Sequence, residues 1–142
     1  MNVYISGPLT GTSDAPNLKT FYEQLGRVCS RAGSNPIIPH LVSDPVVHAD
    51  LSPQSVYALD RSGVVSSDLV IAYVGLPAIG VGQEVEIACQ HDVPVCLVYE
   101  KGRVVTRMVR GNPAVVCEIV ETNREDILAQ LEKRIGDLSN QR

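Results

Sequence analysis

The chain has 142 residues and a mass of 15.3 kDa, which is the size of a single domain. Hydrophobic residues make up 44% and charged residues 20%, values typical of a folded globular protein rather than a disordered chain. A net charge of −4 argues against binding to a nucleic-acid polymer, and the absence of tryptophan leaves little aromatic surface for stacking single strands. Small anionic ligands are not excluded, because backbone N–H groups bind them without basic side chains.

The cysteine pattern points to a reducing compartment. Cys29, Cys89, Cys96 and Cys117 form no C-x-x-C pair, and three of them lie in apolar runs. We therefore expect buried free thiols, not a zinc site or a disulfide framework. No apolar run reaches the length of about 18 residues that a membrane span needs. The first residues are typical of a strand rather than a signal peptide. The sequence predicts a cytoplasmic protein with no membrane partner.

Short β-rich runs alternate with amphipathic stretches along the chain. The predicted strands span residues 2–6, 36–39, 68–74, 93–99 and 114–120. The predicted helices span residues 17–32, 53–66, 83–91, 103–110 and 122–138. Ser52 precedes a proline and is typical of a helix N-cap. We expect one α/β domain over residues 1–142, in which helices flank a mainly parallel five-stranded sheet.

Ligands bind such sheets beyond the carboxyl ends of the strands. The candidate ligand sites are the strand-to-helix loops at residues 6–16, 40–50 and 75–84. The third loop is glycine-rich and enters a helix, which suits an anion at the helix N-terminus. It is not a P-loop, because Gln83 and Glu84 follow the last glycine where that motif has lysine and serine or threonine. It is not a dinucleotide fingerprint either, because Val85 stands where that motif requires a glycine. The alternative is that these glycines only let a strand and a helix pack closely.

Two acidic residues are candidates for chemistry. Glu84 is predicted in the first turn of a helix, where the helix dipole would hold its pKa low and suit an ionised nucleophile. The alternative is a simple charge at a helix N-terminus. Asp60 lies four residues from both Val56 and Val64, so we expect it near an apolar helix face, where a carboxylate needs a function. The alternative is a solvated charge that pairs with Arg61 or another neighbour.

No metal or acyl-transfer motif is present in the sequence. His40 and His48 share one loop with Asp44 and Asp50, but their spacing matches no familiar metal site. No serine is flanked as G-x-S-x-G, and no cysteine–histidine pair has a recognisable spacing. We therefore expect neither a metal nor another cofactor.

Short motifs, in chain order, carry a resemblance to a known family. They are Tyr4-Ile-Ser-Gly7-Pro8, Asp60, Ser67-Asp68-Leu-Val-Ile-Ala, and Gly80-Val-Gly-Gln-Glu84 followed by Ala88. Together they resemble the nucleoside 2-deoxyribosyltransferase superfamily, which includes the deoxyribosyltransferases and the 2′-deoxynucleoside 5′-phosphate N-hydrolases. The match covers residues 3–111, and its last ten residues are more similar to the N-hydrolase branch, whereas Gly7-Pro8 is closer to the transferases. The resemblance implies a flavodoxin-like (Rossmann-like) fold and an enzyme that cleaves an N-glycosidic bond.

The resemblance also implies catalytic roles. Glu84 matches the family's nucleophile, which attacks the sugar C1′ and forms a glycosyl-enzyme intermediate. Asp60 matches the aspartate that positions the nucleophile or handles the proton, and Tyr4 matches a tyrosine close to the nucleophile and the sugar. Water then releases the sugar, or a second base accepts it, in the two-step manner of retaining glycosidases.

A phosphate site is implied in the same way. Thr10 and Ala78 stand where the N-hydrolase branch has a first-loop arginine and a serine that hold the 5′-phosphate. Thr106 matches a phosphate-binding serine that the neighbouring subunit supplies. The residues expected at the substrate or phosphate are Ser6, Gly7, Thr10, Gly11, Ala78, Gly80, Gly82 and Thr106.

The sequence thus predicts an N-hydrolase of (2′-deoxy)nucleoside 5′-monophosphates that forms a homodimer, with Thr106 reaching the neighbouring site. One alternative is a nucleoside 2-deoxyribosyltransferase, which would exchange bases on 2′-deoxynucleosides. Another alternative, from a different class, is a non-catalytic nucleotide-binding sensor.

Overall fold

The structure is a computed structural model that describes residues 1–140 of the chain. A five-stranded sheet in the order β2-β1-β3-β4-β5 forms its centre, and all neighbouring strands are parallel. The strands are β1 (Asn2–Ser6), β2 (Asn35–Ile37), β3 (Leu69–Tyr73), β4 (Val95–Glu100) and β5 (Val115–Glu121). This order confirms the predicted flavodoxin-like α/β fold. The last two residues of the predicted 1–142 domain lie outside the described range.

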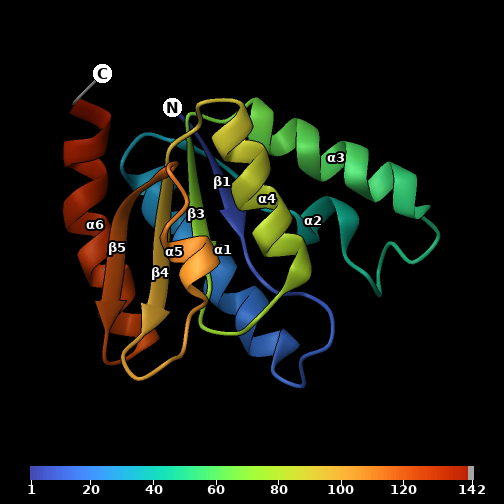
Figure 1. Cartoon of the computed structure of the whole chain (residues 1–142), viewed down its shortest axis with the longest axis horizontal. Helices are drawn as coiled ribbons and strands as arrows, with labels where there is room; N and C mark the ends of the chain where they lie inside the picture. The colour runs from blue at the N-terminus through green and yellow to red at the C-terminus, as the bar shows by residue number, and fades with distance from the viewer. Residues whose placement is uncertain (141–142) are drawn as a thin grey trace.

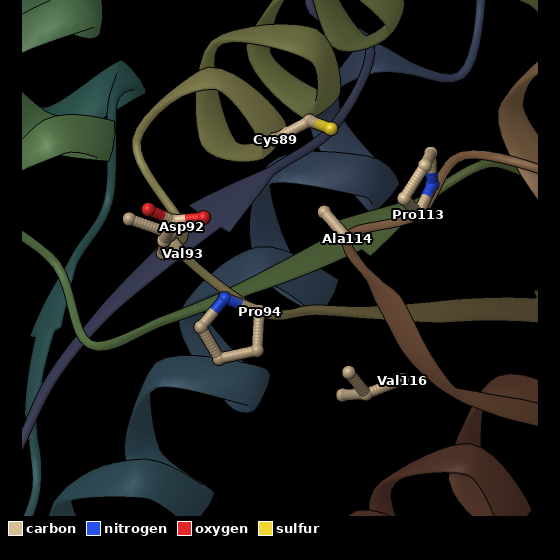
Figure 2. Close-up of a pocket in the computed structure, with 7 residues that line it drawn as sticks. All are labelled: Cys89, Asp92, Val93, Pro94, Pro113, Ala114 and Val116. Carbon is tan, nitrogen blue, oxygen red and sulfur yellow. The ribbon is translucent and has the colours of Figure 1, made fainter.

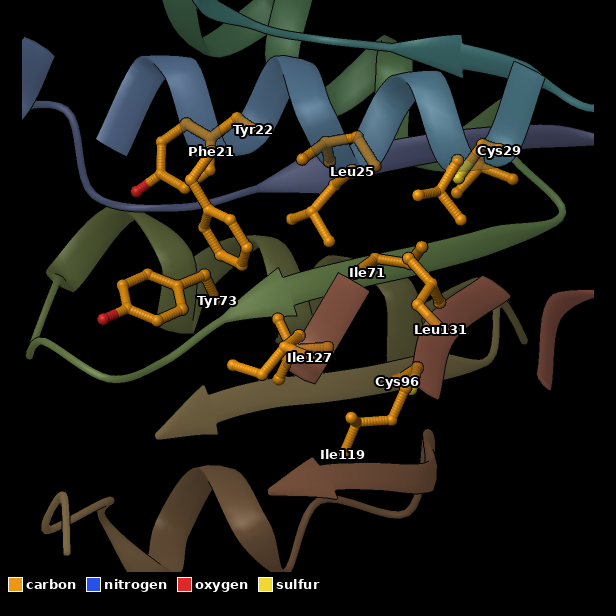
Figure 3. Close-up of a cluster of buried hydrophobic side chains, with 14 of the residues drawn as sticks. Phe21, Tyr22, Leu25, Cys29, Ile71, Tyr73, Cys96, Ile119, Ile127 and Leu131 are labelled. Atoms are coloured by element: carbon orange, nitrogen blue, oxygen red, sulfur yellow. The ribbon is translucent and has the colours of Figure 1, made fainter. Parts of the chain in front are cut away.

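Helices cover both faces of the sheet (Figure 1). The helices are α1 (Ala15–Arg31), α2 (His40–Ser43), α3 (Pro53–Val65), α4 (Ile79–Gln90), α5 (Arg107–Arg110) and α6 (Arg124–Asn140). The α1 and α6 helices pack on one face, and α3 and α4 pack on the other. Figure 3 shows Leu25 of α1, Ile71 of β3 and Leu131 of α6 meeting in the core between the sheet and the first helix pair.

The central strand explains why the two faces need covering. All five residues of β3 are buried, because the sheet continues on both sides of the strand and helices lie above and below it. Its apolar run is the sequence pattern of a strand that is covered on both faces. Each fully buried valine, leucine or isoleucine side chain contributes about 1.5–3 kcal/mol through removal from water. The strand is therefore a rigid support for whatever follows its carboxyl end.

The chain changes faces between β1 and β3. The β1 strand leads into α1 on one face, whereas its neighbour β3 leads into α4 on the other. The two connections therefore separate at the carboxyl ends of these adjacent strands. Such a topological switch point leaves a crevice at the edge of an open α/β sheet, where ligands bind.

Three elements differ from the predictions. The α4 helix begins at Ile79, so Gly80 and Gly82 lie inside it rather than in a loop. Glycine costs only about 1 kcal/mol in a helix, which burial of Val81 and Val85 against the sheet offsets. The predicted 40–50 loop contains the short helix α2, and the predicted 103–110 helix is limited to α5.

The prediction of buried thiols holds for two of the four cysteines. Cys29 and Cys96 are buried, whereas Cys89 and Cys117 are half-buried, and all four are free. Cys117 is a register partner of Cys96 on the neighbouring strand, near the edge of the sheet. Within residues 1–140, no helix has both the length and the apolar composition to cross a membrane.

Candidate active site

A cavity of about 490 Å³ opens at the topological switch point. The β1–α1 loop, the end of α2, one side of α3 and the start of α4 line it. The residues that line it are Gly7, Pro8, Leu9, Thr10, Gly11, Ser43, Pro45, Val56, Asp60, Pro77, Ala78, Ile79, Gly80, Val81 and Glu84. The only acidic side chains among them are those of Asp60 and Glu84, the two carboxylates that the sequence singles out.

Glu84 projects from the second turn of α4 toward the end of β1. Its Oε1 accepts a hydrogen bond from the Ser6 hydroxyl at 3.1 Å. Its Oε2 is buried and has no hydrogen-bond partner among the described residues. One carboxylate oxygen is therefore held in place, while the other is unpaired.

The predicted low pKa of Glu84 is wrong. Burial raises the pKa of this carboxyl to about 7, and the negative charge of Asp60 adds to the rise, although the Tyr4 and Ser6 hydroxyls oppose it. The prediction failed because Glu84 is the sixth residue of α4, not a first-turn residue, so removal from water outweighs the helix dipole. Near neutral pH the carboxyl can exist in either protonation state.

Tyr4 lies in the middle of β1, and its ring is buried between the sheet and α3. Burial raises the pKa of its phenol far above the usual range, and the nearby charges of Glu84 and Asp60 raise it further. The hydroxyl therefore stays protonated and can donate to Glu84. Gly63 of α3 makes room for this ring, because a Cβ atom there would lie 2.7 Å from Tyr4 Cε2.

Asp60 reaches the same cavity from α3, where it is half-buried. Burial raises the pKa of its carboxyl, and a hydrogen bond from Ser43 opposes that rise. Ser43 Oγ lies 3.2 Å from Asp60 Oδ1. The alternative pairing with Arg61 is not what the structure shows, because the Arg61 guanidinium instead donates to His91 Nε2 at 3.2 Å.

Seven of the eight predicted substrate-binding residues line one of two cavities or, for Ala78, both, whereas the eighth, Ser6, donates to Glu84 instead. Five of them line the cavity beside the carboxylates: Gly7, Thr10, Gly11, Ala78 and Gly80. Gly82 and Thr106 instead line an adjacent apolar cavity of about 240 Å³. The Thr106 hydroxyl also caps α5 by accepting a hydrogen bond from the Met108 N–H at 3.2 Å. Among the described residues that line the main cavity, none is lysine, arginine or histidine.

A tyrosine that the sequence analysis did not single out shapes the first loop. The Tyr22 hydroxyl donates to the Pro8 carbonyl at 2.9 Å. A Cβ atom on Gly7 would lie 2.3 Å from the Tyr22 ring, so only glycine fits at this point of the loop. Gly11 has a φ of +73°, which also favours glycine. The loop is thus fixed against α1, and no local sequence signal identifies Tyr22 as its partner.

The histidines of the 40–50 loop have structural partners. His40 Nε2 lies 3.0 Å from Glu23 Oε1, and His48 Nδ1 accepts a hydrogen bond from the backbone N–H of Asp44 at 3.1 Å. Across residues 1–140, no group of three or more His, Cys, Asp or Glu side chains is arranged to hold a metal ion.

A separate cavity of about 280 Å³ lies at the amino ends of β4 and β5, whereas the switch-point cavity lies at the carboxyl ends of the strands (Figure 2). Its lining includes the end of α4 and the residues that precede β4 and β5. Cys89 and Asp92 are its only titratable residues, and apolar or proline side chains make up the rest. It contains none of the predicted site residues, so the switch-point cavity is the candidate active site.

No protein-family model matches the chain. A Methanosarcina barkeri protein named "Putative 2′-deoxynucleoside 5′-phosphate N-hydrolase 1" is 30% identical over 114 residues, which cover 78% of this chain and 69% of that protein. A Methanosarcina mazei protein of the same name is 29% identical over 121 residues, which cover 83% of this chain and 73% of that protein.

Solved structures share the fold. The CMP N-glycosidase BcmB of Clostridium botulinum matches with a TM-score of 0.72 at 18% identity, and the match covers 94% of this chain and 98% of that one. The 2-deoxyribosyltransferase of Bacillus psychrosaccharolyticus matches with a TM-score of 0.68 at 16% identity, covering 90% of each chain.

These similarities define the class of the protein as the nucleoside 2-deoxyribosyltransferase superfamily, whose members are N-glycosidases or deoxyribosyltransferases. The protein is an enzyme of this class. Within it, the chain belongs to the 2′-deoxynucleoside 5′-phosphate N-hydrolase family.

Proposed function

We propose that the protein hydrolyses the N-glycosidic bond of (2′-deoxy)nucleoside 5′-monophosphates and releases free base and sugar phosphate. The observation that carries this proposal is the buried Glu84 carboxyl at the switch point. Ser6 holds one of its oxygens, and the other has no partner among the described residues. The activity in the names of the related N-hydrolases supports the substrate class.

In the first step, ionised Glu84 attacks the sugar. A bond forms between Glu84 Oε2 and C1′ while the C1′–N bond breaks, and the bonding electrons leave with the base. Asp60 supplies a proton to the departing base, a role that suits a carboxyl whose pKa is raised by burial. The transition state carries positive charge at C1′, which the Glu84 carboxylate stabilises before it forms the ester.

In the second step, water hydrolyses the glycosyl–Glu84 ester. The ionised Asp60 carboxylate takes a proton from the water, whose oxygen attacks C1′, and the C1′–Oε2 bond breaks. Glu84 leaves as a carboxylate and again accepts a hydrogen bond from Ser6. The buried Tyr4 hydroxyl has no hydrogen-bond partner among the described residues, so it can donate to this carboxylate and orient it for the next cycle. A second nucleobase in place of the water would give base exchange instead of hydrolysis.

The proposed phosphate position lies at the other end of the cavity. The loop from Gly7 to Gly11 and the start of α4 at Gly80 present backbone to this space. Thr106 does not line this cavity in its own subunit. We therefore propose that it contacts the phosphate bound in the cavity of a second copy of the chain. Two large apolar side chains within two residues of Thr106 support such a homodimer: Val104 and Met108 are 92% and 86% exposed. Free thiols are compatible with a cytoplasmic location.

Chromatography of free base tests the proposal. The purified protein is incubated with (deoxy)nucleosides and their 5′-monophosphates, each with and without a second base. Base release from monophosphates without an acceptor, and its loss in Glu84→Gln, are the expected results. A new nucleoside that forms only with the second base would establish the deoxyribosyltransferase instead. Ligand binding with no base release on any substrate would favour the sensor and refute the hydrolase.

A further inference from the structure

Ser43 is a buried polar residue of the cavity that the mechanism above does not use. It is the last residue of α2, it is 5% exposed, and it lies beside Asp60. Its Oγ is 3.2 Å from Asp60 Oδ1 and 3.0 Å from the carbonyl oxygen of Pro39. Among the described residues, it is the one side chain that forms a hydrogen bond with Asp60. The chemistry of Asp60 therefore depends on what this hydroxyl does.

Counting protons shows that the hydroxyl has two states. A serine hydroxyl carries one proton and two acceptor lone pairs, so it donates to only one of its two neighbours at a time. The Pro39 carbonyl does not need that proton, because it also accepts from the backbone N–H groups of Val42 and Ser43 at 3.0 and 2.8 Å. The hydroxyl can therefore donate to ionised Asp60, or donate to Pro39 and accept the proton of neutral Asp60.

We infer that Ser43 is a positioning residue that holds the Asp60 carboxyl in place in both of its protonation states. This inference rests on the proposed function, in which Asp60 first gives up a proton to the base and later takes one from water. A fixed donor would favour the ionised carboxyl, which is the stronger acceptor, and a fixed acceptor could bind only the neutral one. The hydroxyl supports both steps by a rotation about its C–O bond, with no movement of the backbone.

The surroundings hold Ser43 rigid. The next residue, Asp44, is buried and accepts hydrogen bonds from the backbone N–H groups of Val46 and Val47 at 2.7 and 3.0 Å. Its carboxylate also pairs with Lys19 of α1, and its own N–H donates to His48 Nδ1 at 3.1 Å. The end of α2 is thus tied both to α1 and to its own loop. Such preorganisation lets one hydrogen bond fix a catalytic group.

The charged groups around Asp60 set the direction of the expected effect. Tyr4 of β1 and Glu84 of α4 interact electrostatically with Asp60, and Arg61 on the same helix contacts His91 instead. Burial raises the pKa of Asp60, and Ser43 lowers it. Removing the hydroxyl therefore raises the pKa of Asp60 further and leaves the carboxyl free to rotate.

The test compares Ser43→Ala with a matched control. Ser67 is also buried, and its hydroxyl also donates to a carbonyl four residues earlier, that of Gly63, at 2.7 Å. Ser67→Ala therefore removes an equivalent backbone hydrogen bond without touching a carboxylate. On a monophosphate that the wild type cleaves, we expect Ser43→Ala to lower kcat about tenfold and to move the Asp60 limb of the pH profile upward by about one pKa unit. Asp60→Asn identifies that limb by removing it.

The other outcomes are equally decisive. Ser43→Thr keeps the hydroxyl and should restore most of the activity, whereas Ser67→Ala should change kcat by less than about twofold. Unchanged kcat and pH profile in Ser43→Ala, or equal losses in Ser43→Ala and Ser67→Ala, would overturn the inference. If the wild type releases no base, the proposed function fails, and carboxyl ¹³C NMR titration of Asp60 decides the Ser43 contact alone. A higher Asp60 pKa in Ser43→Ala supports the contact, and an unchanged one refutes it.

Discussion

Replacing Glu84 by glutamine should stabilise the protein at neutral and alkaline pH. Burial raises the pKa of this carboxyl from 4.5 to about 7, so between these values the folded protein binds more protons than the unfolded chain. Stability that depends on Glu84 is therefore lost as the pH rises through this window. At 1.36 kcal/mol per pKa unit, the loss amounts to about 3 kcal/mol above pH 7. Glutamine cannot ionise, so the variant does not lose this stability as the pH rises.

Urea unfolding followed by circular dichroism measures this effect, since the chain has no tryptophan to report by fluorescence. The two proteins should have similar free energies of unfolding below about pH 4.5, where Glu84 is protonated in both states, and Glu84→Gln should gain about 3 kcal/mol by about pH 8.5. The same substitution at exposed Glu86 on the same helix should stay within about 0.5 kcal/mol of wild type. A gain that does not vary with pH, or a less stable Glu84→Gln at high pH, would refute the reasoning.

Three further changes test other parts of the structure. Gly63→Ala should cost about 1–3 kcal/mol of stability, measured by urea unfolding, because its Cβ would lie 2.7 Å from the Tyr4 ring. Thr106→Ala should raise KM for a nucleotide more than for a nucleoside, and equal changes would argue against a phosphate contact. Cys117 should react faster with iodoacetamide at pH 7 than Cys29, as peptide mass spectrometry can show, because hydrogen bonds lower the pKa of the Cys117 thiol whereas burial raises that of Cys29 to about 12.

Apolar periodicity was enough to predict the sheet and its main helices. The buried run of β3 could only be a covered strand, and Ser52 caps α3 as its sequence position indicates, accepting a hydrogen bond from the Ser55 N–H. The pattern failed at the start of α4. Its glycines suggested a loop, but tertiary packing makes this segment helical. The α2 helix, at four residues, is too short to show a helical period.

The candidate site was predicted unevenly. The motifs located Tyr4, Asp60 and Glu84, and the structure brings these three side chains together. It was not possible to predict the contact between Ser43 and Asp60 in this way, because it joins residues 17 positions apart on different helices. The pKa of Glu84 also could not be predicted, since it depends on how deeply the carboxyl is buried, and that depth exists only after α4 packs on the sheet.

The helix that carries Glu84 packs against the hydrophobic core, and this packing has a consequence for how the protein unfolds on heating. On either side of Glu84 in α4, Val81, Val85 and Ala88 are buried against the sheet. The amide hydrogens of this helix should therefore exchange with solvent mainly when the whole domain opens. Heating should not unfold α4, which carries Glu84, before the rest of the fold. Thermal inactivation and thermal unfolding should therefore follow a single curve.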